Sequence, residues 1–413
     1  MPYRNEIYFD AVPDREPAFP KEEFDERLSR IRAVMAREEM DCLFLTSPES
    51  MYYLSGYQCM WYQTESPVEW PPSNGFAVHV DHDGFIHFES EREAFLTRMF
   101  SVDGDVRYFP SESYRDGTRF IVDELKAQGW LNGTVGLEYR AMRPNPAVSG
   151  LLQSRMERGG AKVVDGSHVL REVRWKKSPA EMACLEEAAR IATIGQAAAG
   201  LAIRPDVTEL EVQGEVIRAM ASAGGELPAM MIPVLSGRKT CATHGVSTRK
   251  KIRDGEVVTL DLSGVHKRYH INAARTFHVG QPAHRVLEVA ERAAGAMEVA
   301  NDCLRPNLPV CELNRRVKQY YEEQGLWDSR GWIGGYEMGI GFFSDWVGNF
   351  VYDPLSEKNA DRIFEPNTAV NFEIQVFLPG RVGAFFVVDS FLFYEDRVVR
   401  ATEEIPYELC IVH

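Results

Sequence analysis

Apolar and polar residues recur along the first part of the chain in two periods that predict alternating helices and strands. A helical spacing predicts an amphipathic helix from the apolar positions Phe24, Leu28, Ile31 and Val34. The apolar run at residues 42–46 then predicts a short buried strand. Residues 75–89 predict a hairpin that turns at Asp83-Gly84. A helix at 114–128 and strands at 134–139 and 161–166 complete a predicted α/β domain over residues 1–165.

The second half of the chain changes to longer strands, so we expect residues 166–413 to form an α+β domain. Ser178-Pro179 is a helix-start signal, and a long apolar stripe follows it. We expect an antiparallel sheet covered by helices. The remaining predicted helices are 208–224, 284–303 and 310–325, and the last predicted strands are 369–378 and 384–394.

Composition and charge narrow the classes of partner. With 45% hydrophobic and 26% charged residues, the chain of 413 residues has the make-up of a globular protein. The formal net charge of -15 argues against nucleic acid or an anionic membrane as partner, because phosphate groups attract basic surfaces. It favours a small neutral or cationic ligand.

The cysteines indicate a reducing compartment. There are seven, an odd number without a C-x-x-C pair, which is typical of free thiols. We also find no signal-peptide pattern at the start, and no apolar run approaches the roughly 20 residues of a membrane span. We therefore expect a cytoplasmic protein.

Two carboxylates stand in apolar strands of the second half. Glu373 lies among Val370, Phe372 and Ile374, where an ionised carboxylate is costly unless it meets a cation or a donor. Strand alternation puts it on the face opposite Phe372 and Ile374, although an edge-strand carboxylate facing water is the alternative. Asp261, in VVTLDLSG, could orient a catalytic group, bind substrate or form an ion pair with Arg275.

His244 follows a loop and precedes a basic run. An imidazole that titrates near neutrality suits general acid–base work on a leaving nitrogen. The alternative is a loop histidine that is merely hydrogen-bonded.

Aromatic and acidic side chains near these positions are candidates for substrate contacts. Aromatic faces attract organic cations by about 0.5 to 2 kcal/mol per contact, although such residues more often fill cores or interfaces. The aromatic candidates are Trp61, Tyr62, Trp332 and Trp346, and the acidic ones are Glu337 and Asp345, which flank a glycine-containing loop.

Five segments resemble the "pita-bread" family of aminopeptidase P, prolidase, methionine aminopeptidase and creatinase. They are LDLSG, YHINAARTF, GYEMGIGFF, VNFEIQVFLPG and VVDSFLF. The resemblance implies a creatinase-like α/β amino-terminal domain and an α+β pita-bread catalytic domain. Metal-dependent members carry five ligands, whose positions fall here on Asp261, Asn272, Met338, Glu373 and Val388. Two of the five keep a ligand side chain.

Creatinase hydrolyses a carbon–nitrogen bond without a metal, and this chain is similar to its pattern in part. The resemblance places the catalytic histidine at His244, the guanidinium-binding glutamate at Glu373 and an aromatic contact at Tyr62. It departs at the second glutamate and at the two arginines that hold creatine. These positions carry Ala274, Thr64 and Trp332.

The sequence therefore predicts a metal-independent hydrolase that needs no cofactor and cleaves a C–N bond of a small cationic or zwitterionic compound, like creatinase or ectoine hydrolase. By resemblance, His244 moves a proton between water and the departing nitrogen, and Glu373 fixes the cationic centre. The resemblance also implies a homodimer with the site shared across subunits. A metal-dependent Xaa-Pro peptidase and a non-catalytic binding protein are the alternatives. The predicted substrate-binding residues are Trp61, Tyr62, Asp261, Trp332, Glu337 and Asp345.

Overall fold

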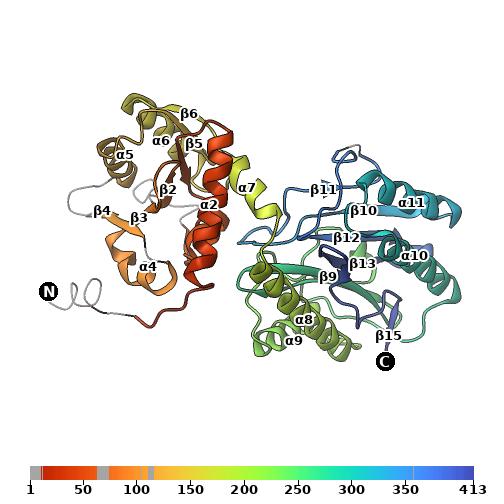
Figure 1. Cartoon of the computed structure of the whole chain (residues 1–413). Coiled ribbons are helices and arrows are strands. Elements are labelled where there is room, and N and C mark those ends of the chain that lie inside the picture. Colours follow the sequence, from red (N-terminus) through yellow and green to blue (C-terminus); the bar gives the residue numbers. More distant parts are fainter. Residues whose placement is uncertain (1–10, 12, 63–73, 103, 110–115, 357) are drawn as a thin grey trace. The chain divides into compact units, whose positions relative to one another are not determined.

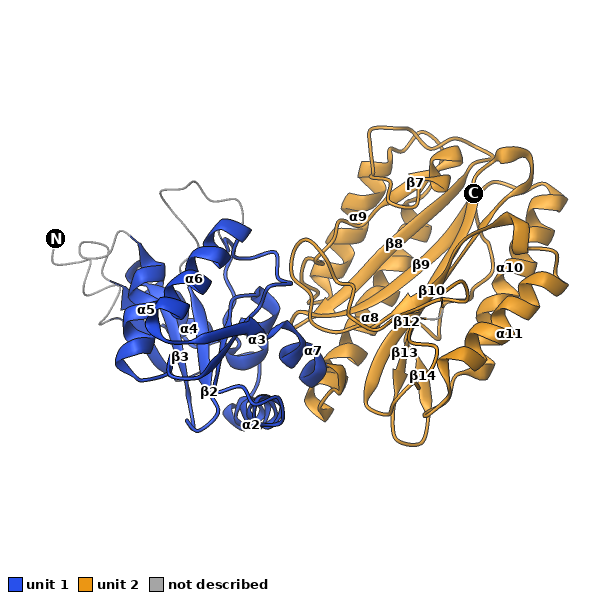
Figure 2. Ribbon diagram, turned by 90° about the horizontal axis from the view of Figure 1, so that it is seen from above, with its two compact units in different colours: residues 1–174 blue, residues 175–413 orange. Residues whose placement is uncertain are grey.

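The computed structural model describes residues 11, 13–62, 74–102, 104–109, 116–356 and 358–413. The chain divides into two compact units, Met1–Arg174 and Trp175–His413 (Figure 2). Helix α7, Ser167–Trp175, follows the boundary expected from the sequence, and most of it falls in the first unit. The limits of the domains stay a prediction.

The first unit is built on a six-stranded sheet with the order β4-β3-β2-β1-β5-β6. Figure 1 labels these strands apart from β1. The β2–β3 pair is the predicted hairpin, with a longer connection than the predicted turn because β2 ends at His79 and β3 begins at Phe85. The strands are β1 Cys42–Leu45, β2 Gly75–His79, β3 Phe85–Ser90, β4 Asp105–Phe109, β5 Thr134–Leu137 and β6 Lys162–Asp165. The helices are α2 Lys21–Arg37, α3 Pro48–Ser55, α4 Ala94–Phe100, α5 Gly117–Ala127 and α6 Pro146–Gly159.

In helix α2, the residues of the predicted apolar stripe are the ones that pack into the interior. Its predicted apolar stripe is buried, and the buried residues are Phe24, Arg27, Leu28, Ile31, Val34 and Met35. The buried Arg27 keeps its charge partnered because its Nε donates to Glu23 Oε1 at 2.9 Å. The first unit is therefore a mixed α/β unit, as the sequence predicts.

The second unit contains a larger sheet with the path β11-β10-β12-β13-β9-β8-β7. Strand β14 pairs with β13, and β15 pairs with β9 in the one parallel pairing described in this sheet. The strands are β7 Val234–Ser236, β8 Val257–His266, β9 Tyr269–Val279, β10 Arg330–Tyr336, β11 Val351–Tyr352, β12 Thr368–Phe377, β13 Ala384–Phe393, β14 Val398–Arg400 and β15 Cys410–Val412.

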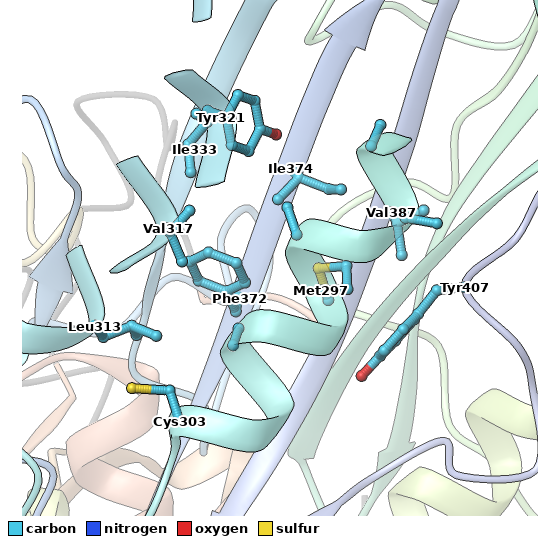
Figure 3. Close-up of a cluster of buried hydrophobic side chains, with 14 of the residues drawn as sticks. Met297, Cys303, Leu313, Val317, Tyr321, Ile333, Phe372, Ile374, Val387 and Tyr407 are labelled. Atoms are coloured by element: carbon cyan, nitrogen blue, oxygen red, sulfur yellow. The ribbon is translucent and has the colours of Figure 1, made fainter. Parts of the chain in front are cut away.

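Four long helices accompany this sheet: α8 Pro179–Ala202, α9 Glu209–Ser222, α10 His284–Cys303 and α11 Val310–Glu323. Helix α8 packs on β8 and β9, and α10 packs on β12 and β13 (Figure 2). The main core lies where Met297 of α10 meets Phe372, Ile374 and Val387 (Figure 3). Since Phe372 and Ile374 point into this core, Glu373 between them points to the opposite face, as predicted.

Local capping explains why the predicted helix starts are accurate. Ser178 accepts from the Glu181 N–H, and the Glu181 side chain accepts from the Ser178 N–H, which forms a capping box. Thr208 and Glu211 form the same motif at the start of α9. The predicted fold, an α/β unit followed by an α+β unit with a largely antiparallel sheet, is confirmed.

Within the described residues, no helix combines the length and the apolar character required to span a bilayer.

Candidate active site

Asp261 and Glu373 lie on the same face of the second sheet, at the two ends of one row of paired residues. Glu373 on β12 pairs with Val388 on β13, Val388 pairs with Ala274 on β9, and Ala274 pairs with Asp261 on β8. Directly paired residues point to the same face of a sheet. The two carboxylates therefore flank an apolar floor of Ala274 and Val388, with main chains about 14 Å apart at three interstrand spacings.

Two asparagine side chains connect the carboxylates through hydrogen bonds. Asn272 Nδ2 donates to Asp261 Oδ1 at 2.7 Å, and its Oδ1 accepts from Asn371 Nδ2 at 3.0 Å. Asn371 Nδ2 also donates to Glu373 Oε1 at 2.8 Å. Both amide orientations are fixed by their partners, since Asn272 Nδ2 also donates to Leu262 O at 3.1 Å and Asn371 Oδ1 accepts from Tyr336 N at 2.7 Å.

Tyr336, the last residue of β10, extends this network on the side of Glu373. Its hydroxyl donates to Asn272 Oδ1 at 3.4 Å and accepts from Trp346 Nε1 at 3.2 Å. Trp346 is 4% exposed and also packs against the His270 ring, so it supports the network from the core.

The surroundings of the two carboxylates favour their protonated forms. Burial, and then the negative charge of Asp261, raise the pKa of Glu373 to about 8, although hydrogen bonds from Tyr336 and Asn371 partly offset this. Burial also raises the pKa of Asp261 to about 7, against a lowering by the Asn272 hydrogen bond. The pair therefore carries less than two negative charges near neutral pH.

The ion pair between Asp261 and Arg275 that the sequence allowed is absent. Arg275 Nη2 pairs instead with Asp389 at 2.9 Å, and the same guanidinium donates to Val388 O. Successive residues of a strand point to opposite faces, so Arg275 turns away from the face that Ala274 shares with Asp261.

His244 lies in an exposed turn after β7, and its loop is tied to β12 beside Glu373. Thr243 Oγ1 donates to Gln375 Oε1 at 3.5 Å, and Gln375 Nε2 donates to Thr240 O at 3.5 Å. Gln375 is two residues from Glu373, so it shares its face of the strand. The imidazole of His244 makes no hydrogen bond to residues that the structure describes. Its catalytic role stays a prediction.

Two further predicted contacts belong to the second unit. Trp332 of β10 is half-buried, and its Cζ2 is 2.8 Å from where a Cβ on Gly334 would stand. Gly334 is the residue of β10 that pairs with Glu373. Asp345 is exposed, and its Oδ1 accepts from Val347 N at 2.9 Å. They remain predicted substrate contacts.

Glu337 follows Tyr336 directly but is already paired. Its Oε1 accepts from Lys177 Nζ at 2.9 Å, and its Oε2 accepts from Asn349 N at 3.2 Å. Lys177 is 5% exposed and Glu337 is 7% exposed, so this is a buried ion pair. Any substrate contact of Glu337 must use the lone pairs that these donors leave.

Trp61 and Tyr62 belong to the first unit. Trp61 is 52% exposed, and Tyr62 is half-buried. The segment is anchored because Arg143 Nε donates to Tyr62 O at 2.6 Å and Cys59 N donates to the Tyr62 hydroxyl at 3.1 Å. Thr64 lies outside the described residues.

The donor set does not fit the dinuclear metal centre that the resemblance implies for metal-dependent relatives. At the second ligand position, Asn272 presents an amide N–H to Asp261, and a donor group cannot coordinate a cation. Met338 and Val388 are fully buried apolar residues at two other positions. In the part of the chain that the structure describes, no three His, Cys, Asp or Glu side chains are grouped as metal ligands.

Asn371 and Tyr336 are the members of the site that the sequence reading missed. Asn371 stands two residues before Glu373 on the same strand face, so alternation from Glu373 would have found it. Tyr336 could not be found in this way, because its place depends on how β10 pairs with β12.

Comparison with known families agrees with this architecture. The pattern of metallopeptidase family M24 matches residues 183–399, and that of the creatinase/prolidase N-terminal domain matches residues 27–175.

Similar proteins span most of the chain and differ in activity. The Xaa-Pro dipeptidase of Pyrococcus furiosus is 24% identical over 92% of this chain and 98% of its own. The creatinase of Bacillus sp. is 25% identical over 89% of this chain and 87% of its own. The ectoine hydrolase of Halomonas elongata is 22% identical over 79% of this chain and 83% of its own.

Among solved structures, the Xaa-Pro dipeptidase from Bacillus anthracis superimposes with a TM-score of 0.78 at 21% identity. The match covers 94% of this chain and 100% of that protein. At this identity the likeness concerns the fold alone.

Proposed function

Since the chain belongs to metallopeptidase family M24, and is a hydrolase acting on carbon–nitrogen bonds, we propose that it works without a metal ion on a small cationic or zwitterionic nitrogen compound. The observation that carries this proposal is the hydrogen bond of 2.7 Å from the Asn272 amide to Asp261, which places a donor where a metal centre needs a second carboxylate.

The proposed substrate carries its positive charge between the two carboxylates. Asp261 and Glu373 flank Ala274 and Val388, so a planar cation lying over this floor meets a carboxylate at each edge. An amidinium or guanidinium group has N–H donors on two edges and suits this arrangement. Its positive charge also favours the ionised forms of both carboxylates.

In the proposed reaction, His244 takes a proton from water as the water oxygen bonds to the electrophilic carbon. The carbon–nitrogen bond then breaks, and His244 returns the proton to the departing nitrogen. Glu373 holds the cationic centre, so it and His244 are the proposed catalytic residues. The proposed substrate contacts are Trp61, Tyr62, Asp261, Trp332, Glu337 and Asp345.

Creatine is not the substrate we propose. Ala274 supplies no carboxylate and Trp332 no guanidinium at positions where creatinase binds creatine, by the resemblance of the sequences. Cyclic amidines, as in ectoine hydrolysis, fit the remaining groups better. We further propose that the protein is a cytoplasmic homodimer whose site is shared between subunits.

A metal-dependent Xaa-Pro dipeptidase is the second candidate. It is favoured by the 24% identity to the Pyrococcus furiosus enzyme across 92% of this chain. This reading needs ligands other than Asn272, Met338 and Val388.

The test is turnover by metal-stripped protein of a panel of ectoine, guanidino acids, creatine and proline dipeptides, followed by mass spectrometry. We expect hydrolysis of a cationic substrate that neither EDTA nor added Mn²⁺ changes. His244→Ala and Glu373→Gln should each lower kcat about 10²- to 10⁴-fold. The control His284→Ala removes a histidine whose side chain is 86% exposed, on α10, and should leave kcat unchanged.

Two results would overturn the proposal. Activity on proline dipeptides that EDTA abolishes and Mn²⁺ restores would establish the dipeptidase. Full turnover by His244→Ala would remove the catalytic assignment.

A further inference from the structure

The loop that carries His244 begins and ends at one buried carboxylate, Glu209. Its Oε1 accepts from Ser236 N and Ser236 Oγ, both at 2.9 Å. Its Oε2 accepts from Thr248 N at 2.9 Å and Thr248 Oγ1 at 3.1 Å. Ser236 precedes residues 237–247 and Thr248 follows them. One side chain thus joins the two ends of the loop.

Glu209 is held in its ionised form by these donors. It is 0% exposed, at the first residue of α9, and Lys239 from within the loop completes its shell with an ion pair. Burial alone would raise the pKa of Glu209, but hydrogen bonds from Lys239, Thr248 and Ser236 outweigh it and hold the pKa below its ordinary value. A buried charge with this many donors ties its partners firmly.

The position of His244 depends on this loop rather than on contacts of its own. The residues from Cys241 to His244 are exposed, and the imidazole has no hydrogen-bonding partner among the described residues. Its location is therefore set by the main chain between Ser236 and Thr248. The middle of that segment is also anchored, because Ala384 N donates to Thr240 Oγ1 at 2.8 Å and Thr243 reaches Gln375.

We propose that Glu209 is a positioning residue that closes the loop of residues 237–247 and so fixes the position of His244 relative to β12, the strand that carries Glu373. The inference rests on the proposed catalytic role of His244. It adds that the reaction depends on a carboxylate that never touches the substrate.

The experiment compares Glu209→Gln with the matched control Glu211→Gln. Both remove one carboxylate from the first turn of α9, but the hydrogen bonds described for Glu211 join it to Thr208 in the capping box and not to the loop. Glutamine at 209 keeps one acceptor and turns the other oxygen into a donor, which then faces the donors of Thr248 and Lys239.

Hydrogen exchange measures the loop directly and needs no substrate. In Glu209→Gln, the amides of Ser236 and Thr248 should exchange about 10- to 100-fold faster, because their charged acceptor is lost. In Glu211→Gln they should change less than about twofold, as expected for a change outside the loop. Unchanged exchange in Glu209→Gln would overturn the proposal.

Kinetics test the consequence for His244 on whichever panel substrate is turned over. Glu209→Gln should lower kcat about 10- to 100-fold with KM changed less than about threefold, since a loosened loop misplaces the proton carrier and not the cation site. Faster exchange with unchanged kcat would overturn the positioning role while leaving the proposed function intact. Full activity of His244→Ala would instead remove the proposed function, and the exchange data would still decide whether Glu209 closes the loop.

If Glu209→Gln does not fold, Lys239→Met decides the same question. It removes the ion pair with Glu209 and the hydrogen bond from Lys239 Nζ to Thr248 Oγ1, on a side chain that is 24% exposed. Amide exchange should again be faster and kcat lower, both by smaller factors than in Glu209→Gln. If amide exchange or kcat stays at its wild-type value, the proposal is overturned.

Discussion

The side-chain amide of Asn272 donates to Asp261 Oδ1 at 2.7 Å, between neighbouring strands of one hairpin. This bond uses a lone pair of Asp261 that a cation would otherwise take. The same amide accepts from Asn371, which holds Glu373, so the contact sets the arrangement of the whole row. Replacing Nδ2 of Asn272 by oxygen, as in aspartate, would put a hydrogen-bond acceptor in place of the donor that faces Asp261.

Asn272→Asp should therefore destabilise the protein and give it affinity for metal. The change removes the donor to Asp261 and places a second carboxylate against the first, which should lower the free energy of unfolding by about 1–3 kcal/mol in metal-free buffer. Added Mn²⁺ should recover part of the loss, because two adjacent carboxylates are ligands that a hard cation prefers. Denaturant unfolding measures the loss of stability in metal-free buffer and its partial recovery in the presence of Mn²⁺. A Mn²⁺ concentration of about 1 mM is at the upper end of the dissociation constants of protein sites for hard divalent cations.

The control is Asn132→Asp, an exposed residue of the first unit that gains the same charge. It should change the free energy of unfolding by less than about 0.5 kcal/mol in either buffer. Wild-type protein stabilised by Mn²⁺ as strongly as Asn272→Asp would contradict the idea that Asn272 excludes metal.

Glu373 makes stability depend on pH with an unusual sign for a carboxylate. Burial and then Asp261 raise its pKa to about 8 in the folded protein, well above the value of an unfolded glutamate. Between these two values the folded state binds more protons than the unfolded state, so the free energy of unfolding falls as pH rises. The contribution is complete below the unfolded pKa and is lost as pH rises through about 8.

Glu373→Gln should remove this loss while keeping the acceptor that Asn371 reaches. At pH 8.5, on the order of the raised pKa, the variant should be more stable than wild type by about 1–3 kcal/mol, and at pH 5 the difference should nearly vanish. Thermal melts at the two pH values measure it. The control Glu404→Gln, at an exposed residue, should change the melting temperature by the same amount at the two pH values. A variant less stable than wild type at the higher pH would refute the sign.

Much of the fold could be predicted because local patterns determine it. The apolar stripe of α2, the start signal at Ser178 and the alternation around Glu373 each depend on residues close in sequence. Predicted and observed bounds of α10 coincide at His284 and Cys303.

The site could be predicted only in part, because its geometry depends on pairing between distant strands. Asp261 and Glu373 are recognised as unusual from their apolar neighbours. That Ala274 and Val388 lie between them follows from the register of β13 with β9, which no local pattern reveals. The same non-local packing directs Trp346 into the core, where it supports Tyr336.

Variants of the buried ion pair between Lys177 and Glu337 distinguish a role of Glu337 in stability from a role in substrate binding. Glu337→Gln leaves the Lys177 ammonium buried without its counter-charge, and should lower the free energy of unfolding by about 3–5 kcal/mol. The double variant Lys177→Met with Glu337→Leu removes both charges and should recover most of that loss, because the desolvation of the ammonium is relieved.

Substrate affinity should follow a different pattern in these two variants. If Glu337 contacts the substrate, as proposed, KM rises about tenfold in both, since each lacks the carboxylate whatever its stability. Steady-state kinetics on the substrate found in the panel, beside denaturant unfolding, gives both quantities for each protein. A KM that returns to the wild-type value in the double variant would mean that Glu337 acts only through the fold, and its proposed contact with substrate would have to be withdrawn.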